Sequence, residues 1–479
     1  MNEIFSPPPG NDDDDDVINN LYESTVQQAS VRFRNVTGSI RTPSRSNVAN
    51  TGQYDIPWLR MDAFIRKRKV KKSLDRVYML IGAIGIFYGL PTVQLLYTYH
   101  QISESTGQTD LCYRNYLCSH RVYSWDDFNH IYSNIVYVLL AVVFCIFVRR
   151  YEKKVHRLEV KLQEQGISEG DIGEGVGHQF GIFYALGLAF GLEGILSGLY
   201  HVCPTEMNFQ FDTSFMFILA ALSTIKIYQF RHTNPICPHN TFGMLALISF
   251  ISVGGIILGS KIYEGIFIFL HVVMILLLSV YLYYLGYVRD DDNNPVTDNN
   301  NPVTDSAIFR KSEVLKKFRN DPFVLFKPDH GTRLTFLLPL IVFNLAISIS
   351  QILGQNPFPT YLVYIFAGNM MLYFLYYCVM KVYHGEAFNI QFIQPLIYLI
   401  FSFALGALGI LYFLDKKYNA NLSPAESRAL NSPCIIESFY DSHDVWHFLS
   451  AGSIFFFFMT LLTLDDGIIQ KPRQEIVAF

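Results

Sequence analysis

The sequence has little charge. Asp, Glu, Lys and Arg make up only 16% of its 479 residues, whereas soluble proteins carry about 25%. This shortage, together with long apolar runs, excludes a soluble cytosolic enzyme. Seven cysteines are too few for a scaffold held together by disulfides. A formal net charge of -4 provides no overall attraction to nucleic acid or to an anionic membrane surface. Hydrophobic residues reach 51%, and this composition indicates a protein that crosses a membrane several times.

Ten stretches of the sequence have the length and apolarity of a transmembrane helix, which needs about 20 residues. Such runs predict helices, because backbone polar groups in lipid must be satisfied within the segment. We therefore expect an all-α polytopic membrane protein whose transmembrane domain covers residues 77–467. The expected spans are 77–99, 129–148, 179–201, 212–230, 243–260, 264–287, 333–353, 360–381, 394–414 and 443–464.

The distribution of Lys and Arg predicts the orientation. Basic clusters precede the first span and follow the second and the sixth, so these segments and both termini are expected to be cytoplasmic. Residues 1–60 contain five consecutive Asp and little apolar periodicity, which predicts a disordered tail before a basic juxtamembrane segment at 61–76. A near-tandem Asn-Asn-Pro-Val-Thr-Asp repeat predicts a disordered insert at about 288–308. Residues 468–479 form the expected C-terminal tail.

Four cysteines fall in loops on the predicted outer side, where the environment is oxidising. Cys112, Cys118, Cys203 and Cys434 are therefore candidates for two disulfides. The favoured pairing joins Cys112 to Cys118 and Cys203 to Cys434, one of three possible connectivities.

Polar residues gather where three expected spans meet the outer face. Ser197 and His201 share a stripe of the third span, and Asp212 opens the fourth. His443 and His447 share one face at the start of the last span, four residues apart. Two imidazoles at this spacing, with a third His and a carboxylate, match the ligands of tetrahedral zinc. We expect a metal site with Asp212 either as a direct ligand or acting through a water.

Other polar residues of the spans have a less specific meaning. Glu193 lies one turn deeper than Ser197, where it would support a metal ligand or make a hydrogen bond to another helix. The remaining histidines lack comparable neighbours in the sequence and are interpreted as structural. They include His100, His120, His130, His271 and His384.

The strings around these residues resemble the systemic-RNAi-defective (SID) transmembrane family. The resemblance extends from about Asp62 to the C-terminus. Its strings are Ser197-Gly-Leu-Tyr-His201-Val-Cys-Pro, Phe209-Gln-Phe-Asp212-Thr-Ser-Phe, Pro424-Ala-Glu-Ser-Arg428, His443-Asp-Val-Trp-His447-Phe-Leu-Ser, Leu464-Asp-Asp466 and Phe128-Asn-His-Ile-Tyr-Ser-Asn134. The family normally has an extracellular β-rich region and one further span before this part, which the chain is expected to lack.

The SID family is similar to alkaline ceramidases and progestin/adipoQ receptors, which share a Ser-x3-His, a following Asp and a final His-x3-His around zinc. The resemblance therefore implies a seven-helix-type zinc-containing core. In it His201, His443 and His447 would hold Zn²⁺, and Asp212 and Ser197 would hold or activate its water. It also implies uptake or trafficking of double-stranded RNA or cholesterol at plasma or endolysosomal membranes. The protein would act as a homodimer or with full-length family members.

Two other hypotheses remain open. In one, the protein is a zinc-dependent hydrolase of a membrane lipid ester or amide at the outer leaflet, with Asp212 as general base and Ser197 orienting the water. In the other, zinc only joins the outer ends of three spans. The outer loops lack a run of Lys or Arg suited to several phosphate contacts, so RNA passage depends on the resemblance alone.

Overall fold

The computed structural model describes a large part of the chain. The described residues are 77–107, 111–123, 125–164, 180–205, 208–231, 238–284, 331–354, 357–386, 392–415, 422–468 and 476. The expected tail at 1–60, the basic segment at 61–76 and the insert at 288–308 lie outside these ranges, as does most of 468–479.

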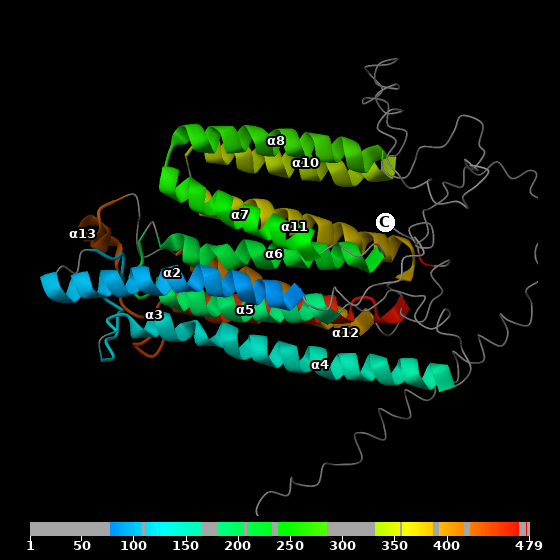
Figure 1. Cartoon of the computed structure of the whole chain (residues 1–479), viewed down its shortest axis with the longest axis horizontal. Helices are drawn as coiled ribbons and strands as arrows, with labels where there is room; N and C mark the ends of the chain where they lie inside the picture. Colours follow the sequence, from blue (N-terminus) through cyan, green and yellow to red (C-terminus); the bar gives the residue numbers. More distant parts are fainter. Residues whose placement is uncertain are drawn as a thin grey trace, which may run out of the picture. The chain divides into compact units, whose positions relative to one another are not determined.

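Long helices run roughly side by side through the described part of the chain (Figure 1). Their bounds are α2 (Val77–Thr106), α3 (Phe128–Ser133), α4 (Ile135–Glu164), α5 (Phe180–Tyr200), α6 (Phe209–Arg231), α7 (Pro238–Leu258), α8 (Lys261–Tyr284), α10 (Gly331–Ile352), α11 (Phe358–Tyr383), α12 (Ile393–Leu414), α13 (Pro424–Ser427) and α14 (Ser442–Thr463). Short 3-10 turns follow α13 and α14 at Arg428–Leu430 and Asp466–Ile468.

Nine helices within the described ranges are long and apolar enough to cross a membrane. The all-helical, multi-pass fold expected from the sequence is therefore confirmed. Of the ten expected spans, the fifth, 243–260, is not among these nine helices. This span falls in α7, where the described apolar stretch, Asn240–Gly255, is shorter than in the other nine helices.

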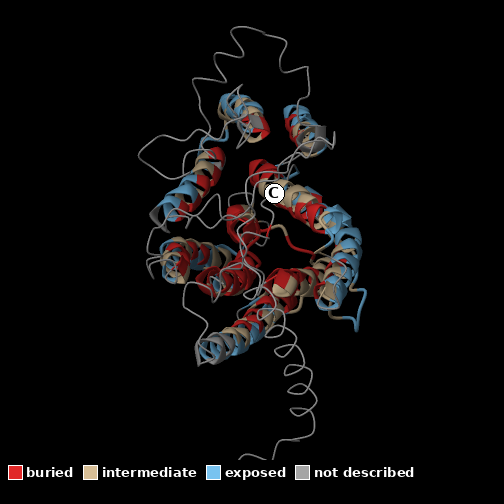
Figure 2. Cartoon of the chain, turned by 90° about the vertical axis from the view of Figure 1, so that its right-hand side faces the viewer, coloured by how far each residue is buried: buried red, intermediate tan, exposed pale blue. Residues whose placement is uncertain are grey.

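Burial separates an inner group of helices from an outer group (Figure 2). Most of α5 and α6 is buried, and α6 packs against both α5 and α11. By contrast, α8 and α12 present large apolar side chains outward, including Leu277 and Leu411. Apolar side chains are stable in this position when lipid rather than water surrounds the helices.

A close backbone contact joins α5 to the start of α4. A Cβ atom at Gly194 would lie 2.7 Å from Tyr137 Cβ and 2.9 Å from the carbonyl oxygen of Asn134. Because only glycine leaves room for this approach, α5 packs directly on the junction of α3 and α4. The contact places Ser197, one turn further along α5, next to the same junction.

One end of the bundle, here named the disulfide end, carries both disulfides of the described residues. Cys112 is bonded to Cys203 and Cys118 to Cys434, with Cα–Cα distances of 5.0 and 4.9 Å. All four candidate cysteines are thus bonded, but the expected pairing of Cys112 with Cys118 is wrong. The loop after α2 therefore joins two different helix ends instead of closing on itself.

Hydrogen bonds explain this pairing, because they hold the loop against both helix ends. The backbone N–H of Tyr113 donates to the carbonyl oxygen of Pro204 at 2.8 Å, beside Cys112 and Cys203. The backbone N–H of Tyr116 donates to Asn431 Oδ1 at 2.9 Å, in the segment that leads to α14. These contacts fix which cysteine meets which.

Candidate metal centre

Three histidines meet at the disulfide end. His201 follows α5, and His443 and His447 lie on the first two turns of α14. His201 Nε2 and His443 Nε2 are 3.2 Å apart, and one ring nitrogen of each histidine lies within 4.8 Å of the other two. His201 and His447 are buried, and His443 is partly buried. The structure thus brings together the three imidazoles that sequence spacing identified.

The three side chains fit a tetrahedral zinc ion. Zinc binds imidazole nitrogens at about 2.0–2.1 Å, so two nitrogens of a tetrahedral site lie roughly 3.3 Å apart. The separation of 3.2 Å between the Nε2 atoms of His201 and His443 agrees with this value. Neutral imidazole is also a preferred ligand of zinc. These residues therefore form a geometrically possible metal site.

The hydrogen bonds of His447 leave its Nε2 atom available to a metal. Ser133 Oγ donates to the carbonyl oxygen of His130 at 3.1 Å and lies 2.8 Å from His447 Nδ1. Asn134 Nδ2 is 3.2 Å from the same His447 Nδ1 atom. These described contacts of His447 are made at Nδ1, so Nε2 is the ring nitrogen that remains for a metal.

Two carboxyl groups, those of Asp212 and Glu193, lie near Ser197. Ser197 Oγ donates to Asp212 Oδ1 at 2.5 Å and so joins α5 to α6. Glu193, one turn further into α5, is buried, and no hydrogen-bond partner of its Oε2 atom is found among the described residues. The group of ligand nitrogens within 4.8 Å consists of the three histidines, and direct binding of metal by Asp212 stays a prediction.

The start of α14 is fixed by a capping box. Asp441 Oδ1 accepts hydrogen bonds from the backbone N–H groups of His443 and Asp444, at 2.8 and 3.1 Å. Asp444 Oδ2 accepts from the backbone N–H of Asp441 at 3.1 Å. This cap satisfies the first free N–H groups of the helix and therefore sets where His443 lies. The Asp-x-x-Asp spacing of this cap is visible in the sequence.

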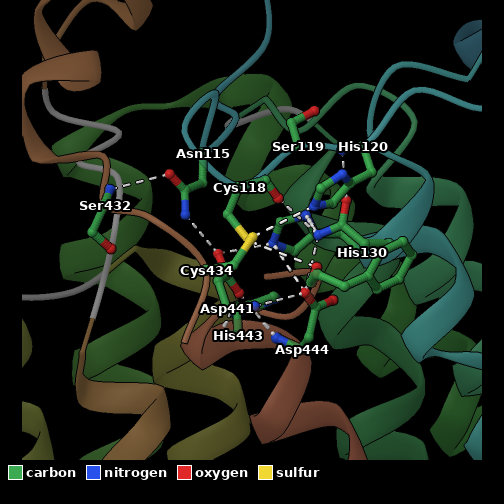
Figure 3. The surroundings of a disulfide bond; sticks show 12 residues. Asn115, Cys118, Ser119, His120, His130, Ser432, Cys434, Asp441, His443 and Asp444 are labelled. Atoms are coloured by element: carbon green, nitrogen blue, oxygen red, sulfur yellow. Dashed lines mark hydrogen bonds and ion pairs between the residues drawn. A yellow bond between two sulfur atoms is a disulfide. The ribbon is translucent and has the colours of Figure 1, made fainter. Parts of the chain in front are cut away.

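His130 lies directly behind the three histidines, although the sequence had given it no part in the site. Its Nδ1 atom is 2.6 Å from Asp127 Oδ1. Its Nε2 atom is 3.0 Å from Asp441 Oδ2, and Figure 3 shows this pair of residues. The ring centroids of His130 and His201 are 5.6 Å apart and the rings are stacked. The available signal was the pair of acidic residues that precedes the Phe128–Asn134 string.

The electrostatic surroundings set the charges of two groups at this end. Burial lowers the pKa of His201 well below its ordinary value, and the neighbouring His443 and His447 lower it further. His201 is therefore neutral. Burial by itself would raise the pKa of Asp441, but His130 outweighs this effect and holds that pKa below its ordinary value. The carboxylate of Asp441 is therefore ionised.

Comparison with known proteins places the chain among membrane proteins. Residues 57–479 match the family described as the dsRNA-gated channel SID-1. The chain is 33% identical over 418 residues to human SID1 transmembrane family member 1, an alignment that covers 86% of this chain and 48% of that protein. It is 29% identical over 422 residues to cholesterol uptake protein 1 of Caenorhabditis elegans, covering 86% and 52%.

The chain spans about half the length of the curated relatives that it matches. Within the chain, however, the matched segment contains every helix that the structure describes, including those that carry the three histidines. On this match, the chain belongs to the SID-1 RNA channel family.

Proposed function

We propose that this chain takes part in the uptake or trafficking of double-stranded RNA, of cholesterol, or of both. The observation that carries the proposal is the family match over residues 57–479, since it includes the whole described bundle. The names of the relatives point to the two cargoes, a double-stranded RNA and cholesterol. Because the chain spans about half of those relatives, the activity is proposed for the membrane body itself.

The disulfide end is proposed to face the outside of the cell or the lumen of an endolysosomal compartment. Disulfides persist in oxidising compartments, and four cysteines at this end are bonded. The basic cluster Arg149–Arg157 lies at the opposite end of α4, which agrees with a cytoplasmic location for that end and for both termini. The family resemblance adds assembly as a homodimer or with full-length family members.

A zinc ion is the proposed cofactor, held by His201, His443 and His447. When bound, zinc supplies Lewis-acid chemistry that polarises a carbonyl and makes water acidic. The structure supports this ligand set through the spacing of the imidazoles. Asp212 is the proposed fourth ligand or proton acceptor, because Ser197 fixes its carboxylate at the same end of the bundle.

A second candidate function is hydrolysis of a membrane lipid ester or amide, and the carboxyl groups of Asp212 and Glu193 favour it. Asp212 would accept the proton of the attacking water, and Ser197 would orient that carboxylate and the water. The Oε2 atom of the buried Glu193, which has no partner in the described part of the chain, would hold a proton or contact a polar substrate group. A purely structural zinc would need neither carboxyl group.

Uptake by cells tests the first function. Cells that display the chain at a verified surface level are given labelled long double-stranded RNA or labelled cholesterol in separate arms. Empty-vector cells and the double variant His443→Ala/His447→Ala are run beside them. Uptake of either cargo above the vector control supports the proposal. No uptake of either, at normal surface level, overturns it for the membrane body alone.

Turnover by purified protein tests the second function. We expect lipid hydrolysis that falls at least about 100-fold in Asp212→Asn, the usual loss when a general base is removed. The variant must still contain zinc, so that loss of the base is separated from loss of the metal. If the wild-type protein with bound zinc leaves a panel of lipid esters and amides intact, the hydrolase hypothesis is wrong. Unchanged cargo uptake in Asp212→Asn would show that transport does not need hydrolysis.

A further inference from the structure

The short helix α3 presents a row of polar side chains to the first turns of α14. Asn129 Nδ2 donates to Asp444 Oδ2 at 3.1 Å, and Ser133 Oγ contacts His447 Nδ1 at 2.8 Å. Between them, His130 reaches Asp441, the residue that caps α14. The six-residue helix α3 thus contacts the start of α14 at three points. Each point lies near a candidate metal ligand or is itself a candidate ligand.

Carboxyl groups face both ring nitrogens of His130. Its Nδ1 atom faces Asp127 at 2.6 Å, its Nε2 atom faces Asp441 at 3.0 Å, and a carboxylate oxygen of Asp444 lies 3.9 Å away. All four side chains are at least nine-tenths buried. His130 is therefore held at both ring nitrogens by buried carboxyl groups.

Asp441 connects His130 to the metal ligands. Its Oδ1 atom holds the backbone N–H of His443, while its Oδ2 atom accepts from His130 and, at 2.8 Å, from Asn115 Nδ2 (Figure 3). A carboxylate held on both sides cannot rotate away from its cap. The position of His443 therefore depends on His130 through a single side chain.

We propose that His130 is a positioning residue of the metal centre. Held at both ring nitrogens by Asp127 and Asp441, it fixes the first turn of α14 and so the placement of His443 Nε2 at 3.2 Å from His201 Nε2. A preset pair of ligands avoids an ordering cost on binding, and residues that hold metal ligands typically change affinity 10- to 100-fold. This inference rests on the proposed metal site.

The alternative to a positioning role is a second metal ion bound by His130 and its neighbours. One ligand atom each of His130, Asp441 and Asp444 lie within 4.8 Å of one another, a spacing that also suits a second metal ion. The other contacts of Asp441 favour positioning, because the backbone N–H of His443 and Asn115 Nδ2 already occupy its two oxygens. Positioning predicts one zinc per chain, and a second site predicts two.

The experiment uses the full chain purified in detergent, with zinc affinity measured by chelator competition. We expect His130→Gln to weaken zinc binding 10- to 100-fold. Asp127→Asn should also weaken zinc binding, since it removes a partner of His130 and leaves the residues of α14 unchanged. The matched control is His271→Gln, another buried histidine, which is bonded to Asn344 and Tyr361 in a different part of the bundle. It should leave zinc affinity unchanged.

Two further readouts distinguish positioning from a general loss of stability. In the cobalt-substituted protein, the visible spectrum should shift in His130→Gln and Asp127→Asn but not in His271→Gln. The double variant His130→Gln/Asp441→Asn should lose less affinity than the sum of the single variants, because both single substitutions break the same His130–Asp441 contact. Wild-type affinity in both His130→Gln and Asp127→Asn would overturn the proposal, as would two zinc ions per chain. A wild-type chain that binds no zinc would instead remove the metal site itself.

Discussion

Lys381 Nζ lies 2.6 Å from Asp465 Oδ1. This contact joins the end of α11 to the residues that follow α14. Tyr377 donates to the other oxygen of Asp465, and Arg231, at the end of α6, forms an ion pair with Glu386. These five residues, here named the inner ion cluster, hold three helices together at the end opposite the disulfides. The arrangement balances two cations with two carboxylates in a buried site.

Removing one carboxylate of the inner ion cluster should destabilise the protein strongly. We expect Asp465→Asn to lower the free energy of unfolding by about 3–5 kcal/mol, because it leaves Lys381 without its nearest anion in a buried site. The change is measured by unfolding the protein in detergent with heat or with a denaturant. The control is Glu437→Gln, which alters an exposed acid and should stay within about 0.5 kcal/mol of wild type. Equal effects of the two substitutions would contradict the prediction.

The acid limit of stability should depend on Glu386. Burial raises the pKa of this carboxyl, but the hydrogen bond and charge of Arg231 and the charge of Lys381 outweigh it, so the pKa lies below its ordinary value of 4.5. A lowered folded-state pKa stabilises the protein above the ordinary value, and this stabilisation is lost as the pH falls through the folded-state pKa. Melting temperatures between about pH 6 and pH 3 should therefore fall less steeply in Glu386→Gln than in wild type. Parallel curves would show that Glu386 is not responsible.

The contact of α5 with α4 should tolerate no added methyl group at Gly194. Alanine would place its Cβ 2.7 Å from Tyr137 Cβ, and overpacking of this kind typically costs about 1–3 kcal/mol. The matched variant is Gly243→Ala in α7, where no heavy atom lies within 4 Å of the added carbon. We expect a lower melting temperature only for Gly194→Ala. A loss of the same size at both positions would point to a general effect of alanine in these helices.

The disulfide pairing can be tested by cutting the chain between the second and third spans. A protease site placed within residues 165–179 separates Cys112 and Cys118 from Cys203 and Cys434. With the observed pairing, both bonds cross the cut, so the two fragments should migrate together without reductant and separate with it. The double variant Cys112→Ser/Cys118→Ser is the control that must separate. Separation of the wild-type fragments without reductant would instead support bonds within each fragment.

The sequence predicted the helices well because a transmembrane helix needs only local information, namely enough consecutive apolar residues to cross lipid. It also identified the three histidines, since two of them share a helix face and the third ends another span at the same depth. His130 was missed for a physical reason. Its partner Asp441 lies more than 300 residues further along the chain, and an isolated histidine near a span end has no spacing that indicates a role.

By itself, the sequence determined an all-helical membrane protein with bonded cysteines and a possible metal site, since apolar length, residue type and i, i+4 spacing are properties of single segments. Only the tertiary structure decided which cysteines pair, that His130 holds the cap of α14, and that Lys381 meets Asp465. Each of these depends on which helix ends the packing of α5, α6, α11 and α14 brings together. Distance between side chains of different helices is a result of that packing, and no local pattern encodes it.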